Sequence, residues 1–503
     1  FILTIGACAL LLLAGAPVWG AKGGIPGKPP PTDPPTEPPT DPPDAVVPDF
    51  YFWRGGHMDG PHESSKALGS SRDGLTAVGS TVVVDFQRAW RSDIGWAINT
   101  DLDGDTIPPL YNELQVQEDI GKIAPSRPSA AFAASDMTGA TLEFGCPGYD
   151  KTVLTDLSLD WCDSFPVGTF ERGEVTYGIE WLLPALDAED GYEFLNMLDY
   201  VAFPDFGGGI SDMQVNDVSA DGVILVGTGT VKKGLRAFRV DTVEGPFEDV
   251  EGVMVPIPIQ LTIQEVIDDV VGQTLQYSSA QAVSADGMII AGYGGTRNGT
   301  KAFVTTYVDY DLELEEAVLE SYILPTIPGG KFAEAYAMTV TPEGVIYIAG
   351  RSDSPRGPQA CIWFEGEDPT TTDVVETWSV KGLGGLSKKK LDSVATGIAY
   401  RVGAADGDLM VVGTSQSILY PSEAFVWAGN PVFEPDGEDE EFIGYMYDLE
   451  YILTKTGAGA ASSFGSRWIL NEATGVSALG DRIVGWGTNP EGGIEAWVVT
   501  GYP

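Results

Sequence analysis

The sequence predicts an all-β protein, a β-propeller of seven blades with three to four antiparallel strands each. Two observations predict this fold. A motif recurs in which an Asp-Gly turn joins two apolar strands, and its turn glycines are residues 74, 139, 222, 287, 344, 407 and 480. The spacings of 57 to 83 residues are too short for independent domains, so each unit must bury one face against its neighbours. A ring of small sheets meets that need because it leaves only short edges.

Each copy predicts the same order of elements. A strand rich in β-branched residues leads to a turn in which glycine supplies a positive φ, then to a second strand, a polar loop and a third, aromatic strand. The copies at Val215–Gly222 and Ala280–Gly287 are clear examples. We expect a fourth strand from segments such as Tyr445–Leu449, and a crossing between blades at glycine pairs such as Gly329-Gly330.

Two features bear on the number of blades. The aromatic segment Phe50–Trp53 precedes the first full copy, and we expect it to complete the last blade by pairing with the C-terminal strand. The copy within residues 126–205 is degenerate, so the count falls to six if this copy is an insertion. A right-handed β-solenoid is the alternative fold, although solenoid repeats are usually much shorter.

One insert departs from the strand pattern. Thr262–Glu265 resembles a capping box. Five apolar residues of the segment fall on one helical face, namely Ile263, Val266, Ile267, Val270 and Val271. The sequence therefore predicts a short helix on the rim of the ring.

The N-terminal segment predicts a secreted protein. Residues 1–20 resemble a signal peptide, because Phe1 to Val18 is almost continuously apolar and Val18 and Gly20 are placed as at a signal-peptidase site. A membrane anchor is the alternative, but the apolar run breaks at Pro17, short of the roughly 20 residues that span a bilayer. Residues 21–48 repeat Pro-Pro-Thr-Asp and Pro-Pro-Thr-Glu, which predicts an extended linker. Residues 49–503 would then form an extracellular propeller; the cell surface and the periplasm are alternative locations. We expect no transmembrane segment after signal cleavage.

Charge and histidine content argue against several classes of function. The chain has 28 Lys and Arg against 73 Asp and Glu, and the resulting net charge of −45 repels nucleic acid and anionic membrane surfaces. His57 and His62 are the only histidines, so a histidine base or a His-rich metal site has little to draw on. No nucleophile elbow, phosphate loop or dinucleotide motif appears in a fitting context.

Calcium is the one cofactor that the sequence suggests. Asp101, Asp103 and Asp105 alternate in a short loop, a spacing that lets carboxylate oxygens surround Ca²⁺. The loop resembles the calcium loops of thrombospondin type 3 repeats, although no glutamate stands at the twelfth position. A solvated acidic loop without metal is the alternative.

Two cysteines predict a cross-link in the degenerate copy. Cys146 and Cys162 have fifteen residues between them, and in a secreted protein they would form a disulfide that contributes roughly 3 kcal/mol. Cys361 replaces the phenylalanine of an aromatic strand, so we expect a buried, unreactive thiol. The turn residues Asp73, Asp221 and Asp286 have a structural explanation too, since aspartate hydrogen-bonds within such turns.

The combination of Val-Ser-Ala-Asp-Gly, a strand ending in Val-Gly or Ala-Gly, and Ala-Phe-x-Trp resembles the HAF-type extracellular repeats of secreted and surface proteins. The resemblance covers residues 50–503 and implies a secreted, propeller-like protein, but it supplies no catalytic residues. Ser477–Gly480 lacks the turn aspartate and Thr341–Gly344 replaces it with glutamate, which argues against a functional turn carboxylate.

From these features we expect a secreted, non-catalytic binding or scaffold protein whose ligand is a glycan or a protein. The alternative is a carbohydrate-active enzyme, a glycosidase or lyase, with paired carboxylates in the propeller channel. A structural matrix protein is the third interpretation. Two channel carboxylates at glycosidase spacing would favour the enzyme, and an aromatic-lined groove would favour binding.

Overall fold

The computed structural model describes much of the chain between Phe50 and Gly501. The described ranges are 50–54, 62–74, 76–83, 86–93, 99–100, 106–107, 118–119, 129–134, 166–172, 175–181, 200–203, 210–232, 234–243, 247–250, 253–267, 270–297, 299–311, 316–367, 376–387, 391–401, 409–429, 444–455 and 468–501. The predicted signal peptide and linker lie outside them.

The fold is an all-β β-propeller. Five of its sheets have four antiparallel strands each. The first two are β8 (Ser129–Ala134), β9 (Pro166–Arg172), β10 (Val175–Trp181) and β11 (Tyr200–Phe203), then β12 (Ser211–Val218), β13 (Ile224–Val231), β14 (Gly234–Asp241) and β17 (Ile259–Gln260). The next three are β20 (Tyr277–Val283), β21 (Ile289–Thr296), β22 (Gly299–Asp311) and β23 (Glu316–Ile323), then β24 (Ala333–Val340), β25 (Ile346–Ser352), β26 (Gln359–Glu367) and β27 (Glu376–Gly384), and finally β28 (Ser393–Tyr400), β29 (Leu409–Ser415), β30 (Glu423–Gly429) and β31 (Gly444–Asp448).

A larger sheet contains both ends of the described chain. Its eight strands are β1 (Phe50–Arg54), β2 (His62–Ser70), β3 (Thr76–Val83), β4 (Phe86–Asp93), β7 (Glu118–Asp119), β32 (Ile469–Val476), β33 (Arg482–Thr488) and β34 (Ile494–Gly501). The described strands therefore form five four-stranded blades and one eight-stranded sheet, and the predicted count of seven separate blades is not confirmed. The remaining described strands are three hairpins, β5 (Asn99–Thr100) with β6 (Thr106–Ile107), β15 (Phe247–Val250) with β16 (Val253–Pro256), and β18 (Gln264–Ile267) with β19 (Val270–Thr274).

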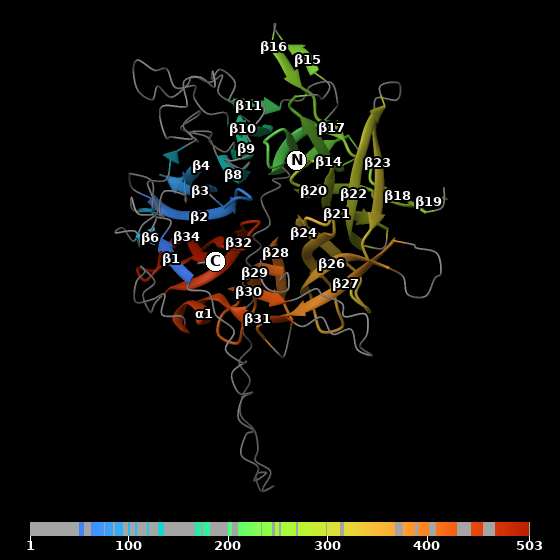
Figure 1. Ribbon diagram of the computed structural model, residues 1–503. Coiled ribbons are helices and arrows are strands. Elements are labelled where there is room, and N and C mark those ends of the chain that lie inside the picture. The colour runs from blue at the N-terminus through green and yellow to red at the C-terminus, as the bar shows by residue number, and fades with distance from the viewer. Residues whose placement is uncertain are drawn as a thin grey trace, which may run out of the picture. The chain divides into compact units, whose positions relative to one another are not determined.

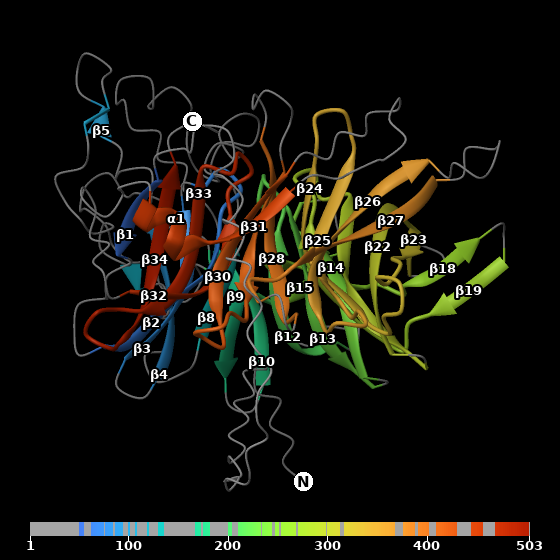
Figure 2. The ribbon, with the colours of Figure 1, turned by 90° about the horizontal axis from the view of Figure 1, so that it is seen from below.

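The sheets close into a ring. The first strand of each sheet packs on the sheet before it, so that β12 contacts β8, β9 and β10, and the pattern repeats through β20, β24, β28 and β32. β2 contacts β32, β33 and β34, and β8 contacts β2, β3 and β4, which completes the circle. In Figure 1 the colours pass round the ring in chain order until red β34 lies beside blue β1, and Figure 2 shows the same sheets standing side by side.

β1 joins the two ends of the folded region, as the sequence predicted. It pairs antiparallel with β34 from Phe50–Gly501 to Arg54–Trp497. Phe52 is fully buried and its ring centroid lies 5.1 Å from that of Trp468. The Arg54 guanidinium donates two hydrogen bonds to Glu495, of 3.0 and 2.7 Å, and the Glu495 side chain is only 1% exposed. The closure thus combines a strand ladder, an aromatic contact and a buried ion pair.

Arg54→Met is expected to destabilise this closure by about 3–5 kcal/mol, the cost of removing one partner of a buried ion pair. The substitution would remove the guanidinium from the buried Glu495 carboxylate, which would still accept a hydrogen bond of 2.8 Å from the Asn489 amide. The measurement is urea unfolding. Adding Glu495→Gln should recover part of the loss, because the buried charge disappears. A double variant no more stable than Arg54→Met would argue against the ion pair as the cause.

The repeated glycine of the second strand has a steric reason. In β21, a Cβ at Gly292 would clash with the Ser279 carbonyl oxygen of β20 and would lie 2.9 Å from the Phe303 ring of β22. Gly292 is paired with Phe303, so the aromatic ring of the third strand covers the glycine. The corresponding pairs are Gly79 with Trp90, Gly227 with Phe238, Gly413 with Phe425 and Gly485 with Trp497. Cys361 takes the aromatic position opposite Gly350 and is fully buried, as predicted, and burial raises the pKa of its thiol.

The turns also match the sequence prediction. Gly222 has a φ of 79°, and the Ser219 hydroxyl donates to the Asp221 carboxylate at 2.5 Å. The same carboxylate accepts the Val223 N–H at 3.0 Å, so its role is structural. In the copy that lacks the turn aspartate, Ser477 donates instead to Asp481, directly after Gly480.

Two local predictions were wrong. The predicted rim helix is the β18–β19 hairpin, in which Ile267 pairs with Val270, because β-branched side chains favour strands over a marginal helical pattern. In the degenerate copy, the turn glycine Gly139 predicts a second strand directly after it, at 140–145, but β8 pairs with β9 at 166–172, and residues 140–145 lie outside the described ones. The helix α1 (Leu449–Lys455) follows β31 and was not predicted. No helix in the described ranges has the length and hydrophobicity to cross a membrane.

Candidate functional site in the central channel

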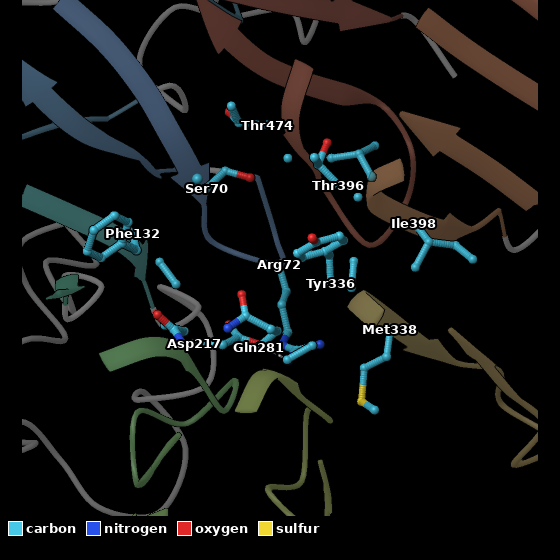
Figure 3. Close-up of a pocket in the computed structure, with 18 of the residues that line it drawn as sticks. Ser70, Arg72, Phe132, Asp217, Gln281, Tyr336, Met338, Thr396, Ile398 and Thr474 are labelled. Atoms are coloured by element: carbon cyan, nitrogen blue, oxygen red, sulfur yellow. Dashed lines mark hydrogen bonds and ion pairs between the residues drawn. The ribbon is translucent and has the colours of Figure 1, made fainter. Parts of the chain in front are cut away.

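The candidate site is a cavity of about 280 Å³ at the centre of the ring. Its walls come from β2, β8, β12, β20, β24, β28 and β32, which are the first strands of their sheets or, for β2 and β32, of the two halves of the large sheet. Figure 3 shows labelled side chains from differently coloured, sequence-distant strands around this common space.

A repeated β-bulge places one side chain per wall strand in the channel. In β20 the bulge lies between Ala280, which pairs with Gly292, and Ala282, so Gln281 is the extra residue. Bulges re-aim a side chain, and the glycine opposite allows the close approach of the two strands. The bulge residues that line the cavity are Leu68, Phe132, Asn216, Gln281, Tyr336, Thr396 and Thr474.

Several bulge side chains connect one sheet to the next. The Asn216 amide donates to the Ala280 carbonyl oxygen at 2.6 Å. The Thr396 hydroxyl donates to the Ala473 carbonyl oxygen at 2.5 Å, and the Thr474 hydroxyl donates to the Ala67 carbonyl oxygen at 3.1 Å. Each accepting residue stands directly before the bulge residue of the next sheet, so these bonds link neighbouring bulges around the channel. They also fix the rotamers of the polar side chains, so the wall of the channel is preorganised.

One ion pair lies in this largely neutral wall. Arg72 Nη2 is 3.4 Å from Asp217 Oδ2 and also donates to the Val283 carbonyl oxygen. Asp217 accepts the Val283 N–H at 2.8 Å. Burial raises the pKa of the Asp217 carboxyl, while Arg72 and the backbone N–H groups act in the opposite direction. Arg72 Nε is buried without a hydrogen-bond partner among the described atoms, so the guanidinium retains one donor.

A tyrosine cluster borders the channel between β21 and β24. The Tyr336 hydroxyl donates to Glu334 at 2.6 Å, and Arg351 Nε donates to the same carboxylate oxygen at 2.5 Å. The Tyr293 and Tyr336 ring centroids are 5.8 Å apart in an edge-on arrangement. Burial raises the pKa of both tyrosines, which therefore act as neutral hydroxyl donors.

A second cluster of titratable groups lies away from the channel, at β30, β31 and α1. Burial raises the pKa of Glu450 to about 7, and the charges of Asp448 and Glu423 act in the same direction. Asp448 caps α1 by accepting the Glu450 N–H at 2.9 Å. The exposed rings of Tyr445 and Tyr447 lie on the adjacent strand.

Glu450→Gln is expected to change how stability depends on pH. The native state holds the Glu450 proton more tightly than an unfolded chain of pKa 4.5, so the free energy of unfolding falls as pH rises from about 4.5 to about 7. The glutamine variant should lose less stability across that window, measured by urea unfolding at several pH values. Glu320→Gln, at an exposed position on β23, is the matched control. Parallel curves for the parent and Glu450→Gln would contradict the expectation.

The site residues predicted from sequence do not fall in the described part of the chain. Asp101, Asp103 and Asp105, the calcium candidates, lie outside it, as do Cys146 and Cys162, so the calcium site and the disulfide stay predictions. Among the described residues, no group of three or more His, Cys, Asp or Glu side chains is arranged to hold a metal ion.

Sequence reasoning missed the channel residues, although a signal for them exists. In most copies the bulge residue stands between two small residues, as in Ala280-Gln-Ala282, Ala335-Tyr-Ala337 and Ala395-Thr-Gly397. Two small residues that flank a variable one indicate a strand that packs closely on its neighbours. The side chain of the variable residue is then free to line the channel. In four of the copies the bulge residue also stands six positions before the turn glycine, as Gln281 does before Gly287.

The comparisons with known proteins add little beyond the fold. No family model matches the chain, and no curated protein matches it. Among solved structures the chain is similar to the β-propeller domain of Cps50 (Swd1) from Myceliophteria thermophila, with a TM-score of 0.38 and 10% identity over 90% of this chain and all of that one. The chain is a β-propeller whose channel is lined by bulge residues and by both polar and apolar side chains. The comparisons assign it to no family.

Proposed function

We propose that this chain is a non-catalytic binding protein that holds part of a glycan in its central channel. One observation carries the proposal: seven bulge side chains from distant strands converge on one cavity of about 280 Å³. Amide and hydroxyl groups dominate its polar lining, and Phe132 and Tyr336 add aromatic surface. Such a wall offers hydroxyl and amide oxygens as hydrogen-bond acceptors with little charge, which suits a neutral polyhydroxylated ligand.

The preorganised wall supports a glycan over a protein segment. Asn216, Thr396 and Thr474 are already fixed by hydrogen bonds, so a ligand would order few side chains on binding. The cavity lies near the lower end of the volumes of small-molecule sites, about 300 Å³, and a folded protein partner would need a far larger surface.

The glycosidase alternative receives less support from the lining. Asp217 is the one carboxylate among the described residues that line the cavity, and it is paired with Arg72. Retaining and inverting mechanisms both use two carboxyl groups across the scissile bond. Turnover of any glycan that binds would favour the alternative, so it is the outcome to test next.

Leu68→Trp is expected to block the channel. The larger ring would fill space in the cavity that Leu68 lines together with Phe132 and Thr474 of the adjoining sheets, and it should reduce binding to any glycan hit by roughly 100-fold or more, because most ligand contacts would be lost. The measurement is binding of residues 49–503 to a glycan array, with calcium and then with a chelator. Leu479→Trp is the matched control, since Leu479 is 58% exposed.

A defined array hit that Leu68→Trp removes and Leu479→Trp retains supports the channel as the site. A blank array for the parent protein would contradict the glycan proposal and favour a protein-binding scaffold or a structural matrix protein. A hit unaffected by Leu68→Trp would move the site to another surface.

We further propose seven blades for this ring. The eight-stranded sheet would be two blades, β32-β33-β34-β1 and β2-β3-β4-β7, since Ser64 and Ile494 form the single pair that joins β2 to β34 in the described ladder. The bulge that recurs in seven strands supports this division. Membership of the HAF-type repeat group, secretion, the disulfide and calcium binding remain part of the same proposal and rest on the sequence.

A further inference from the structure

A group of positive charges lies at one end of three neighbouring sheets of this strongly acidic chain. The net charge is −45. Yet six basic residues lie at one end of the sheets that begin with β12, β20 and β24. At this end the second strand of each sheet turns into the third, and the chain enters the first strand. We call this group the basic end: Lys232, Arg236, Arg297, Lys301, Lys331 and Arg356.

The strand register places these residues at the same end. Lys232 follows Val231, which pairs with Gly234, and Arg297 follows Thr296, which pairs with Gly299. Lys331 precedes Ala333, which pairs with Ser352. Arg236 and Lys301 follow these turns on β14 and β22, and Arg356 lies between β25 and β26.

Contacts between sheets make the basic end continuous. Arg236 donates from its guanidinium to the Gln276 carbonyl, at the start of the next sheet. A Cβ at Gly299 would lie 3.2 Å from the carbonyl oxygen of Lys331, so the turn of one sheet adjoins the entry to the next. The Leu391 N–H donates to the Arg356 carbonyl at 3.3 Å, which extends the contact toward β28. The side chains of Lys232, Arg297 and Lys331 are exposed.

Acidic residues do not cancel this charge. In the described part of the same end they are Asp212, Glu265, Glu334, Asp353 and, at the entry to the next sheet, Asp392, and Glu334 is already paired with Arg351. The opposite end has the acidic turns, with Asp73, Asp221, Asp286, Glu343 and Asp481. Among the described residues of these three sheets, basic side chains therefore outnumber acidic ones at the basic end, so the potential there differs from what the net charge suggests.

We propose that the basic end binds an acidic polysaccharide, a glycan polymer with carboxylate or sulfate groups. The cations are spread over three sheets, which suits a long polymer better than a small anion. Nucleic acid is disfavoured because its dense phosphates would bring far more negative charge against the acidic remainder of the molecule. This inference goes beyond the channel proposal, since it concerns another surface and does not depend on the cavity.

The test is binding of the full chain to polygalacturonate and to carboxymethyl dextran, with uncharged dextran as the reference. Affinity should fall when the salt concentration is raised from about 0.1 M to about 1 M, because the Debye length then shrinks from about 10 Å to about 3 Å. The triple variant Lys232→Gln, Arg297→Gln, Lys331→Gln should bind the anionic polymers on the order of 100-fold more weakly.

A matched control separates local charge from bulk charge. Val243→Glu, Met288→Glu and Leu479→Glu together change the net charge by the same amount at exposed positions of the opposite end. This triple variant should retain binding, and both variants should keep the thermal unfolding midpoint of the parent because every altered side chain is exposed.

Four outcomes would overturn the proposal: no binding of either anionic polymer by the parent, equal binding of uncharged dextran, equal losses in the two triple variants, or tighter binding of duplex DNA than of the polysaccharides. Leu68→Trp should leave this binding unchanged, so failure here and failure of the channel proposal are distinguishable.

Discussion

Deleting residues 1–54 is expected to open the ring and to remove most of the free energy of unfolding. β34 would lose the strand that pairs with it from Phe50 to Arg54, and Trp468 and Trp497 would lose the buried Phe52 ring. Truncating a buried phenylalanine alone costs about 3–5 kcal/mol, and the lost ladder adds to it. The measurement is urea unfolding followed by tryptophan fluorescence.

The control is deletion of residues 1–48, which keeps β1 and should leave the unfolding curve of the parent unchanged. Equal stability of the two deletions would show that β1 is dispensable for closure and would contradict the expectation.

Gly292→Ala is expected to be strongly destabilising. Its Cβ would clash with the Ser279 carbonyl oxygen and crowd the Phe303 ring at 2.9 Å, so β20 and β21 must separate at the bulge. We expect a loss of about 4 kcal/mol or more, the range of severe core substitutions. Because the bulge aims Gln281 into the channel, ligand binding should weaken as well.

Gly344→Ala separates this steric effect from backbone strain. Gly344 has a φ of 87°, and no atom lies within 4 Å of the position that a Cβ would occupy. Alanine there therefore meets only the cost of a left-handed conformation, about 1–3 kcal/mol. If the two variants were equally destabilised in urea unfolding, the close approach of the strands at Gly292 would not be the cause.

Local chemistry in the repeat made much of the fold predictable. The turn at Gly222, the fourth strand that begins at Gly444 and the buried Cys361 follow from patterns that need no knowledge of distant contacts. The pairing of β1 with β34 was predictable because a propeller must close and an aromatic segment precedes the first copy. The helix over Thr262–Val271 failed because the same apolar spacing also fits a hairpin, and β-branched side chains decide between the two. The second strand of the degenerate copy failed because the partner of β8 lies more than thirty residues away in sequence.

Residue types at short spacing, together with composition, were sufficient to predict the fold class, the turns, the closing strand and the net charge. They were not sufficient to predict which residues meet in space. Ring closure brings Leu68, Gln281 and Thr474 to one cavity, and strand register brings Lys232, Arg297 and Lys331 to one end of an acidic protein. The physical reason is that a bulge or a turn fixes where a side chain points, but only the packing of one sheet on the next fixes what lies beside it.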